Sequence, residues 1–217
     1  MNSPSGIEAP PARQRRKQSD RREEAERRIL QSAMELVSEK GVTGTTLGEV
    51  GERAGYSRGL PAHHYGNKEG LLTALVGRIG RNFRAARNAA GPWRPGLDAI
   101  LGVVGLYIDR AASHDCATRA LYIMFTEAFV SGGALAVALD QFNCASLAYF
   151  EGHLRIGIRK QEIRADVDPV AESIVILGAL RGISAQFLLG SPHANPAQVR
   201  DALVGTMARA LRPDPTA

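Results

Sequence analysis

The sequence predicts an all-α fold, with an N-terminal three-helix helix-turn-helix head and a larger C-terminal helical domain. Apolar residues recur at helical spacing along most of the 217-residue chain, capping residues and glycines separate the segments, and no segment alternates apolar and polar residues as a strand does. We expect a flexible basic tail over residues 1–18, the head over 19–66, the larger domain over 67–212 and a C-terminal tail over 213–217.

The first helix is expected to begin near Ser19 or Asp20, because acidic residues follow at the end where the helix dipole favours negative charge. Gly41 is expected to end it as a C-cap glycine. Its buried stripe consists of apolar residues at helical spacing: Ile29, Leu30, Ala33, Met34, Leu36 and Val37.

The next two helices are predicted to be short. Thr46 can cap the first of them while Glu49, three residues later, reaches back in a capping box. Gly55 then supplies the turn, and Ser57 is expected to cap the third helix. Two short helices joined by a tight glycine turn are typical of a helix-turn-helix.

The larger domain begins with a long helix, which Asn67 is expected to cap and the Gly91 to Pro95 stretch to end. Amphipathic segments follow near residues 97–112, 117–131, 134–162, 168–190 and 196–211. The segment 168–190 is apolar on every side at its centre, so it needs cover on both faces. A central helix of one subunit and a helix of a dimer interface both satisfy that need.

Charge and composition exclude several classes of protein. The net charge is +6 over residues 1–90 and −1 over the remainder, so the basic excess that attracts nucleic acid lies in the N-terminal part. Two cysteines exclude a disulfide framework, and we expect them to be small buried thiols. No secretory signal and no stretch of roughly 20 apolar residues is found. A cytoplasmic protein without a membrane partner is therefore expected.

The order and spacing of about 45 residues resemble the DNA-binding module of the tetracycline-repressor (TetR) family. The residues that carry the resemblance are the segment from Arg28 to Gly41, the pair Thr45-Thr46, and the run Ala54-Gly-Tyr-Ser-Arg-Gly-Leu-Pro-Ala-His-His-Tyr-Gly-Asn-Lys-Glu-Gly-Leu-Leu72. The resemblance implies a homodimer of all-helical subunits, each with a DNA-binding head and a domain that binds a small-molecule effector and releases DNA.

The resemblance also implies which residues meet DNA. The segment from Ser57 to His64 corresponds to the recognition helix, which lies in the major groove, and Lys68 corresponds to a position that meets a phosphate. Arg58 carries the planar fork that can read a guanine edge. The expected DNA-binding residues are Thr46, Tyr56, Ser57, Arg58, Gly59, Leu60, His63 and Lys68.

Two residues depart from the family pattern. Ala62 replaces a tyrosine that often contacts the DNA backbone, and Pro61 lies in the first turn of the recognition helix, where its ring restrains Leu60. His63 and His64 are adjacent and point about 100° apart on a helix, which is poor geometry for joint metal binding, so no metal site is expected. His63 is expected to be exposed and His64 to be packed in the head.

The effector pocket is expected to be apolar. Its candidate lining residues, which ordinary core packing would also explain, are Trp93, Tyr107, Tyr122, Phe125, Phe129 and Phe142. The candidate dimer interface comes from the segments 134–162 and 168–190, with Phe142, Tyr149, Ile174, Leu177, Gly178 and Gly182. The row Arg78, Arg81, Arg84 and Arg87 is interpreted mainly as a solvated helix face.

Together these features predict a ligand-responsive repressor that binds a palindromic operator in double-stranded DNA and leaves it when a small, apolar effector binds. The alternative is a helical dimeric ligand-binding module with weak or no sequence-specific DNA binding. In that case Pro61 and Ala62 would reflect the loss of operator recognition. No catalytic triad, carboxylate pair or set of metal ligands can be assembled, so the protein is not expected to be an enzyme or to need a cofactor.

Overall fold

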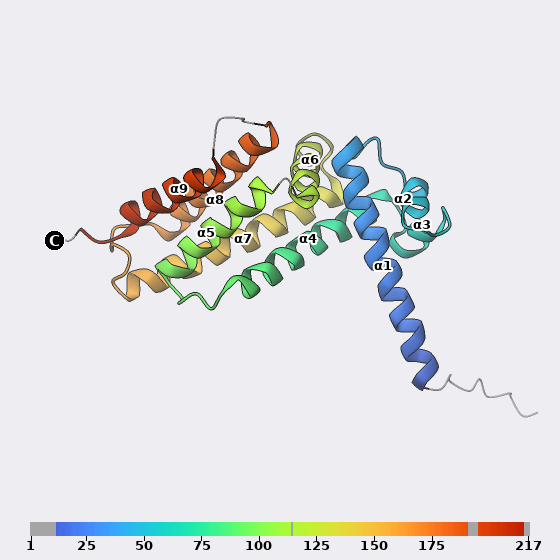
Figure 1. Ribbon diagram of the computed structural model, residues 1–217, viewed down its shortest axis with the longest axis horizontal. Helices are drawn as coiled ribbons and strands as arrows, with labels where there is room; N and C mark the ends of the chain where they lie inside the picture. The colour runs from blue at the N-terminus through green and yellow to red at the C-terminus, as the bar shows by residue number, and fades with distance from the viewer. Residues whose placement is uncertain (1–11, 114, 191–194, 215–217) are drawn as a thin grey trace, which may run out of the picture.

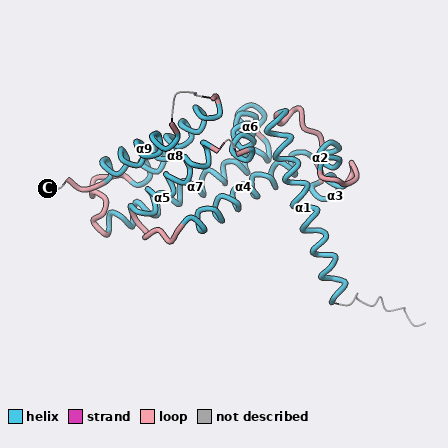
Figure 2. Tube along the Cα trace, viewed as in Figure 1, coloured by secondary structure: helices cyan, strands magenta, loops and turns pink. Residues whose placement is uncertain are grey.

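The computed structural model describes residues 12–113, 115–190 and 195–214, and in these ranges it contains nine helices and no strands (Figures 1 and 2). The all-α prediction is therefore confirmed. The helices are α1 (Ala12–Lys40), α2 (Leu47–Arg53), α3 (Leu60–Tyr65), α4 (Lys68–Ala90), α5 (Leu97–Ala112), α6 (Cys116–Ser131), α7 (Gly133–Arg159), α8 (Pro169–Leu188) and α9 (Pro196–Leu211).

The first helix is longer than expected. It begins at Ala12 instead of near Ser19, because the arginine, lysine and glutamine residues of the basic run are good helix formers. Its N-terminal turns project away from the body of the protein (Figure 1). The basic run consists of Arg13, Arg15, Arg16 and Lys17; the sequence leaves open whether it is a solvated tail or lies along DNA, and its side chains are outside the described part of the structure. At the other end Gly41, with φ of 76°, terminates the helix as predicted.

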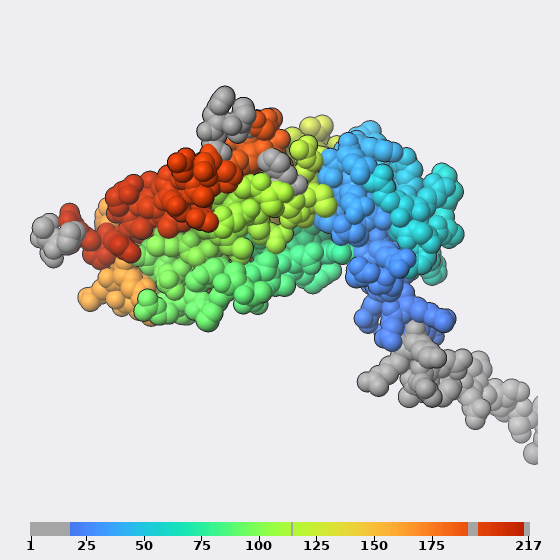
Figure 3. Space-filling view, in the orientation of Figure 1, coloured from blue at the N-terminus to red at the C-terminus, as the bar shows by residue number. Residues whose placement is uncertain are grey.

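The apolar residues form two clusters. The first cluster contains residues of α1, α2, the first turns of α4, α6 and the start of α7. It includes the predicted stripe of α1, in which Ile29 and Val37 are completely buried. The other joins α5, α7, α8 and α9. Because the first cluster crosses from the head into the larger domain, the two pack against each other directly (Figure 3). Helix α4 runs from the head into the larger domain (Figure 1).

Two helices of the larger domain are capped by residues far away in the sequence. Glu69, in the first turn of α4, accepts a hydrogen bond from the Ala134 backbone N–H at the start of α7. Glu162 accepts one from the Leu97 N–H at the start of α5, with an N···O distance of 3.2 Å. Neither α5 nor α7 has a side-chain cap of its own, so these contacts satisfy amides that would otherwise lack partners.

Helix α8 has one buried and one exposed face. Ile176 and Leu180 are completely buried against α5 and α7, whereas Ile174 and Val175 are 57% and 59% exposed. By length and mean hydropathy alone α8 would be able to cross a membrane, which differs from the expectation that no segment qualifies. Its buried face packs against the second cluster as the buried face of an amphipathic core helix does.

The predicted interface residues fall on different sides of α7 and α8. Ile174, Gly178 and Gly182 lie on the exposed face of α8, and an added Cβ at either glycine would meet no atom within 4 Å. Leu177 packs in the core of its own subunit, and Phe142 and Tyr149 line an internal cavity. The exposed residues, not these three, therefore form the face that a partner could cover. Cys144, expected to be buried, is also exposed on α7.

Candidate DNA interface and effector cavity

The head has the helix-turn-helix geometry that its sequence predicts. The Thr46 hydroxyl accepts a hydrogen bond from the Glu49 N–H, and the Glu49 carboxylate accepts one from the Thr46 N–H, which completes the capping box. Gly55 adopts a φ of 80°, and the Tyr56 N–H then donates to the Gly51 carbonyl at 2.9 Å. This turn places α3 directly against α2.

The recognition helix begins later than predicted. Helix α3 starts at Leu60, with Gly59 as its N-cap, so Ser57 does not cap it. A helix capped by Ser57 would need the residue 61 N–H to donate to the Ser57 carbonyl, and Pro61 has no N–H. Ser57 instead accepts a hydrogen bond from the Leu60 N–H in a tighter turn. The exposed element is therefore a turn followed by a six-residue helix.

The candidate DNA-binding residues divide by exposure. Those exposed in the turn and on α2 and α3 are Thr46, Ser57, Arg58, Gly59 and His63. Tyr56 and Leu60 are half-buried and pack against the core of the head, so their side chains are less accessible than the sequence suggested.

Arg58 is the strongest candidate for reading a base. Its guanidinium lies 2.7 Å from the Glu52 carboxylate of α2, and both side chains are mostly exposed. An exposed ion pair of this kind contributes about 0–1 kcal/mol, so a guanine edge or a phosphate could displace Glu52. The pair holds Arg58 on the outer side of the helix-turn-helix in the absence of DNA.

Lys68, His63 and His64 differ in their exposure and in their contacts. Lys68 is half-buried, and its ammonium donates to the Thr43 carbonyl at 3.3 Å, so it lies at the edge of the head. His63 is exposed, as predicted. The His64 side chain is only 10% exposed and lies 3.7 Å from Glu26 of α1, which agrees with its predicted packing role.

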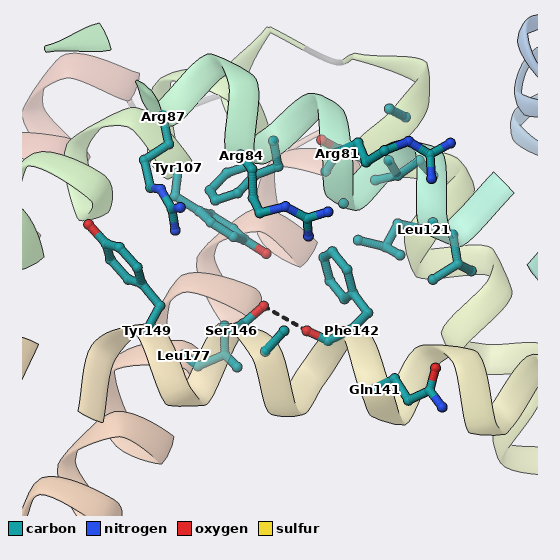
Figure 4. A pocket seen from close by; sticks show the side chains of 18 of the residues that line it. Arg81, Arg84, Arg87, Tyr107, Leu121, Gln141, Phe142, Ser146, Tyr149 and Leu177 are labelled. Carbon is teal, nitrogen blue, oxygen red and sulfur yellow. Dashed lines mark hydrogen bonds between the residues drawn. The ribbon is translucent and has the colours of Figure 1, made fainter. Parts of the chain in front are cut away.

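A cavity of about 540 Å³ lies in the larger domain, between helices α4, α5, α6, α7 and α8 (Figure 4). This volume falls in the usual range for small-molecule sites, about 300–1,000 Å³. Its wall contains buried apolar side chains such as Val103, Leu121 and Leu177. The cavity is therefore a candidate site for a sizeable apolar ligand between helices of the larger domain.

The aromatic prediction for this cavity was only partly right. Tyr107 and Phe142 line it, and so does Tyr149, which was assigned to the interface. The other four do not: Trp93 lies between α4 and α5, and Tyr122, Phe125 and Phe129 lie on α6 outside the lining. Phe129 is 83% exposed at the end of α6, and Trp93 packs against α5 at Gly102. Aromatic residues are common in any core, so residue type alone could not separate them.

Sequence reasoning missed the arginines of the cavity. Five arginines line it, namely Arg81, Arg84, Arg87, Arg110 and Arg181, and no aspartate or glutamate does. Three of them come from the row on α4 that was interpreted as a solvated face. Arg81 and Arg84 are indeed exposed, but together with the half-buried Arg87 they also border the cavity, which the sequence did not indicate. Arg78, the first of the row, instead donates to the Arg27 carbonyl of α1.

The Tyr149 ring and the neighbouring His153 lie at one end of the cavity. Arg87 stacks over the Tyr149 ring at 4.2 Å from its centroid, and burial raises the pKa of the Tyr149 hydroxyl. The His153 ring lies 4.5 Å from that of Tyr149. The Gly96 N–H donates to His153 Nδ1 at 3.2 Å, so this nitrogen must be unprotonated. Burial, with the positive charges of Arg87 and Lys160, lowers the pKa of His153 below its ordinary 6.5.

The lowered pKa predicts a loss of stability in mild acid. As the pH falls through about 6.5, the unfolded chain takes up a proton at His153 that the folded chain resists, so the free energy of unfolding decreases. We expect the melting temperature to fall more between pH 7.5 and pH 5.5 in the wild type than in His153→Gln, measured by circular dichroism. An equal fall in both proteins would contradict this assignment.

The sequence of the head is similar to that of known regulatory proteins. Residues 29–75 match the model of the bacterial regulatory proteins of the tetR family. The transcriptional regulator BetI of Burkholderia thailandensis is 36% identical over 58 residues, which are 27% of this chain and 30% of BetI. The match thus spans less than a third of the curated relatives and concerns the head.

Solved structures resemble nearly the whole chain. A Rhodococcus sp. protein assigned to the TetR family of transcriptional regulators superposes with a TM-score of 0.77 and 21% identity, over 87% of this chain and 99% of that one. The regulator FadR of Bacillus subtilis, solved in complex with stearoyl-CoA, gives a TM-score of 0.72 and 16% identity, over 84% and 97%. At these identities the structures share the fold. Residues 29–75 therefore have the sequence of a tetR-type head, and the chain as a whole shares the helical fold of these solved regulators.

Proposed function

We propose that the protein is a DNA-binding transcriptional regulator, and that a homodimer presents two helix-turn-helix heads to a palindromic operator in double-stranded DNA. The observation that carries the proposal is Arg58 held on the exposed side of a helix-turn-helix whose sequence matches the tetR model. Two heads related by a two-fold axis would enter successive major grooves about one turn apart. Such a protein acts in the cytoplasm and is a regulator, not an enzyme.

The cavity of the larger domain is the proposed effector site. Helix α4 lines it and also begins at Lys68 in the head, so a ligand that shifts α4 would change the position of the head. The FadR structure was solved with stearoyl-CoA, which supports an effector with a long apolar part. Release from DNA would then follow from a higher affinity of the effector for the conformation that does not fit the operator.

Substitution of Arg58 tests the DNA-binding role. We expect Arg58→Ala to weaken binding to the DNA upstream of the protein's own gene about 10- to 100-fold and to relax the choice of sequence, because a bidentate arginine contact with guanine contributes about 1–3 kcal/mol of discrimination. Fluorescence anisotropy at fixed salt measures both effects. Arg164→Ala is the matched control, since Arg164 is also exposed and ion-paired but lies between α7 and α8.

The same titration separates the proposal from its alternative. If the wild type binds all duplexes equally at moderate salt and Arg58→Ala changes nothing, the protein is a ligand-binding module that does not read an operator. Sequence-selective binding that depends on Arg58 excludes that alternative.

A further inference from the structure

We infer that the effector is an amphiphile with an apolar chain and a phosphate-bearing head group, and that Arg84 and Arg87 bind the head group at the edge of the cavity. The inference rests on the proposed role of this cavity as the effector site. It replaces the apolar effector expected from the sequence with a ligand that carries negative charge.

The charge of the cavity is the first observation. Arg110 is paired with Asp115 at 2.7 Å. Among the described residues, no carboxylate lies within ion-pair distance of the other lining arginines, and no acidic residue lines the cavity. Four positive charges therefore surround one hollow: those of Arg81, Arg84, Arg87 and Arg181. Arginines gathered in this way repel one another, and an anion between them removes that repulsion.

The arrangement of the arginines indicates where the anion lies. The Arg84 guanidinium projects across the cavity toward α7, and Arg87 lies over the ring of Tyr149 (Figure 4). Arg84 is exposed and Arg87 half-buried, so both belong to the rim. They are one turn apart on α4, and two guanidinium groups at this spacing suit a group with several oxygens. A phosphate offers more acceptor oxygens and more charge than a carboxylate does.

Arg181 marks the inner wall. Its Nη2 nitrogen is buried and has no hydrogen-bond partner, which is costly for a charged group. The Tyr107 hydroxyl lies beside it, and burial raises the pKa of this hydroxyl. The remaining wall is made of apolar side chains, among them Val103 and Leu121. An apolar chain would thus occupy the interior, and a polar atom along it would satisfy Arg181.

A series of probes with the same ten-carbon chain tests the charge of the ligand. Isothermal titration calorimetry of the full-length protein would compare decanol, decanoate, decyl phosphate and decanoyl-coenzyme A, with coenzyme A alone to test whether the chain is needed. We expect a phosphate-bearing probe to bind at least about tenfold more tightly than decanol and than decanoate, because charge-assisted hydrogen bonds are stronger than neutral ones. Tighter binding of decanoyl-coenzyme A would indicate a nucleotide thioester, and tighter binding of decyl phosphate a simple lipid phosphate.

Variants locate the head group. We expect Arg84→Ala/Arg87→Ala to lower the affinity for the phosphate probes about 10- to 100-fold and to leave decanol binding unchanged. Arg119→Ala is the control, because Arg119 is exposed on α6 and does not line the cavity. The inference is overturned if the probes bind the wild type equally, if decanoate matches the phosphates, if none binds, or if the double variant weakens all probes alike.

Operator binding without any probe separates this inference from the proposed function. We expect Arg84→Ala/Arg87→Ala to bind the operator as the wild type does, because both arginines lie outside the head. If the wild type shows no sequence-selective DNA binding, the regulator proposal is refuted, whatever the calorimetry shows. Normal operator binding together with charge-independent ligand binding would refute the inference alone.

Discussion

Gly178→Arg is expected to convert the proposed dimer to a monomer without unfolding the subunit. Gly178 lies on the exposed face of α8, where an added Cβ meets no atom within 4 Å, so the single subunit accommodates a side chain there. Arginine is also a better helix former than glycine by roughly 1 kcal/mol. In the proposed dimer, however, the same side chain would hold the partner's helix away and bury a charge without a counter-ion.

The effect on DNA binding should be large. Two linked heads bind an operator with an avidity that can exceed that of one head by about 10²–10⁴, and a monomer loses this gain. Light scattering after size-exclusion chromatography would measure the mass, and anisotropy the operator affinity. Ile174→Asp, one turn earlier on the same face, should behave alike. Ala202→Arg on the exposed side of α9 is the control. Dimers that persist in both α8 variants would show that the subunits associate through another face.

Gly51→Val is expected to abolish operator binding by separating α2 from α3. A Cβ at this position would lie 2.5 Å from the Ser57 carbonyl oxygen and 3.1 Å from Cδ of Pro61. The nearer contact is with the backbone of the turn, which cannot rotate away as the end of a long side chain can. Overpacking of this kind costs about 1–3 kcal/mol, and here it displaces Arg58, whose position carries the proposed base contact.

The damage should remain local. We expect Gly51→Val to lose at least about 100-fold in operator affinity while the larger domain stays folded and dimeric and binds the probes of the cavity as before. Gly105→Val on α5 is the control, since the Cβ there would meet only the Arg200 side chain, at an ordinary contact distance of 3.7 Å, and lies outside the head. Undiminished operator binding by Gly51→Val would mean that the contact of α2 with the turn does not position the recognition helix.

Several helix ends were predicted correctly from signals that lie within a few residues of them. The Thr46 and Glu49 capping box is present, and the Asn67 side chain accepts the Gly70 N–H at 2.8 Å to start α4. The same local reasoning failed at Ser57, because a good capping residue cannot start a helix when proline, four residues later, lacks the N–H of the first hydrogen bond. Pro61 is the residue of the sequence that marks this limit.

The candidate cavity was predicted less well. Two of six expected aromatic residues line it, and the arginines that distinguish it were assigned to solvent. A usable signal is the small residue Gly80 on α4, where an added Cβ would lie 3.3 Å from the Phe142 ring. A glycine that faces a neighbouring helix leaves room for a cavity beside the arginines of the same helix. This signal can be recognised only when the neighbouring helix is known.

The sequence by itself determined the all-helical class, the order of the helices and the family of the head, because periodicity, caps and turn residues act within one or two turns of chain. Tertiary structure alone decided that Arg84 faces the same hollow as Leu121 and Leu177, and that Glu69 caps α7. These relations depend on how α4 packs against helices far along the chain. Packing depends on whole helix surfaces, so local sequence patterns do not specify which side chains meet between two packed helices.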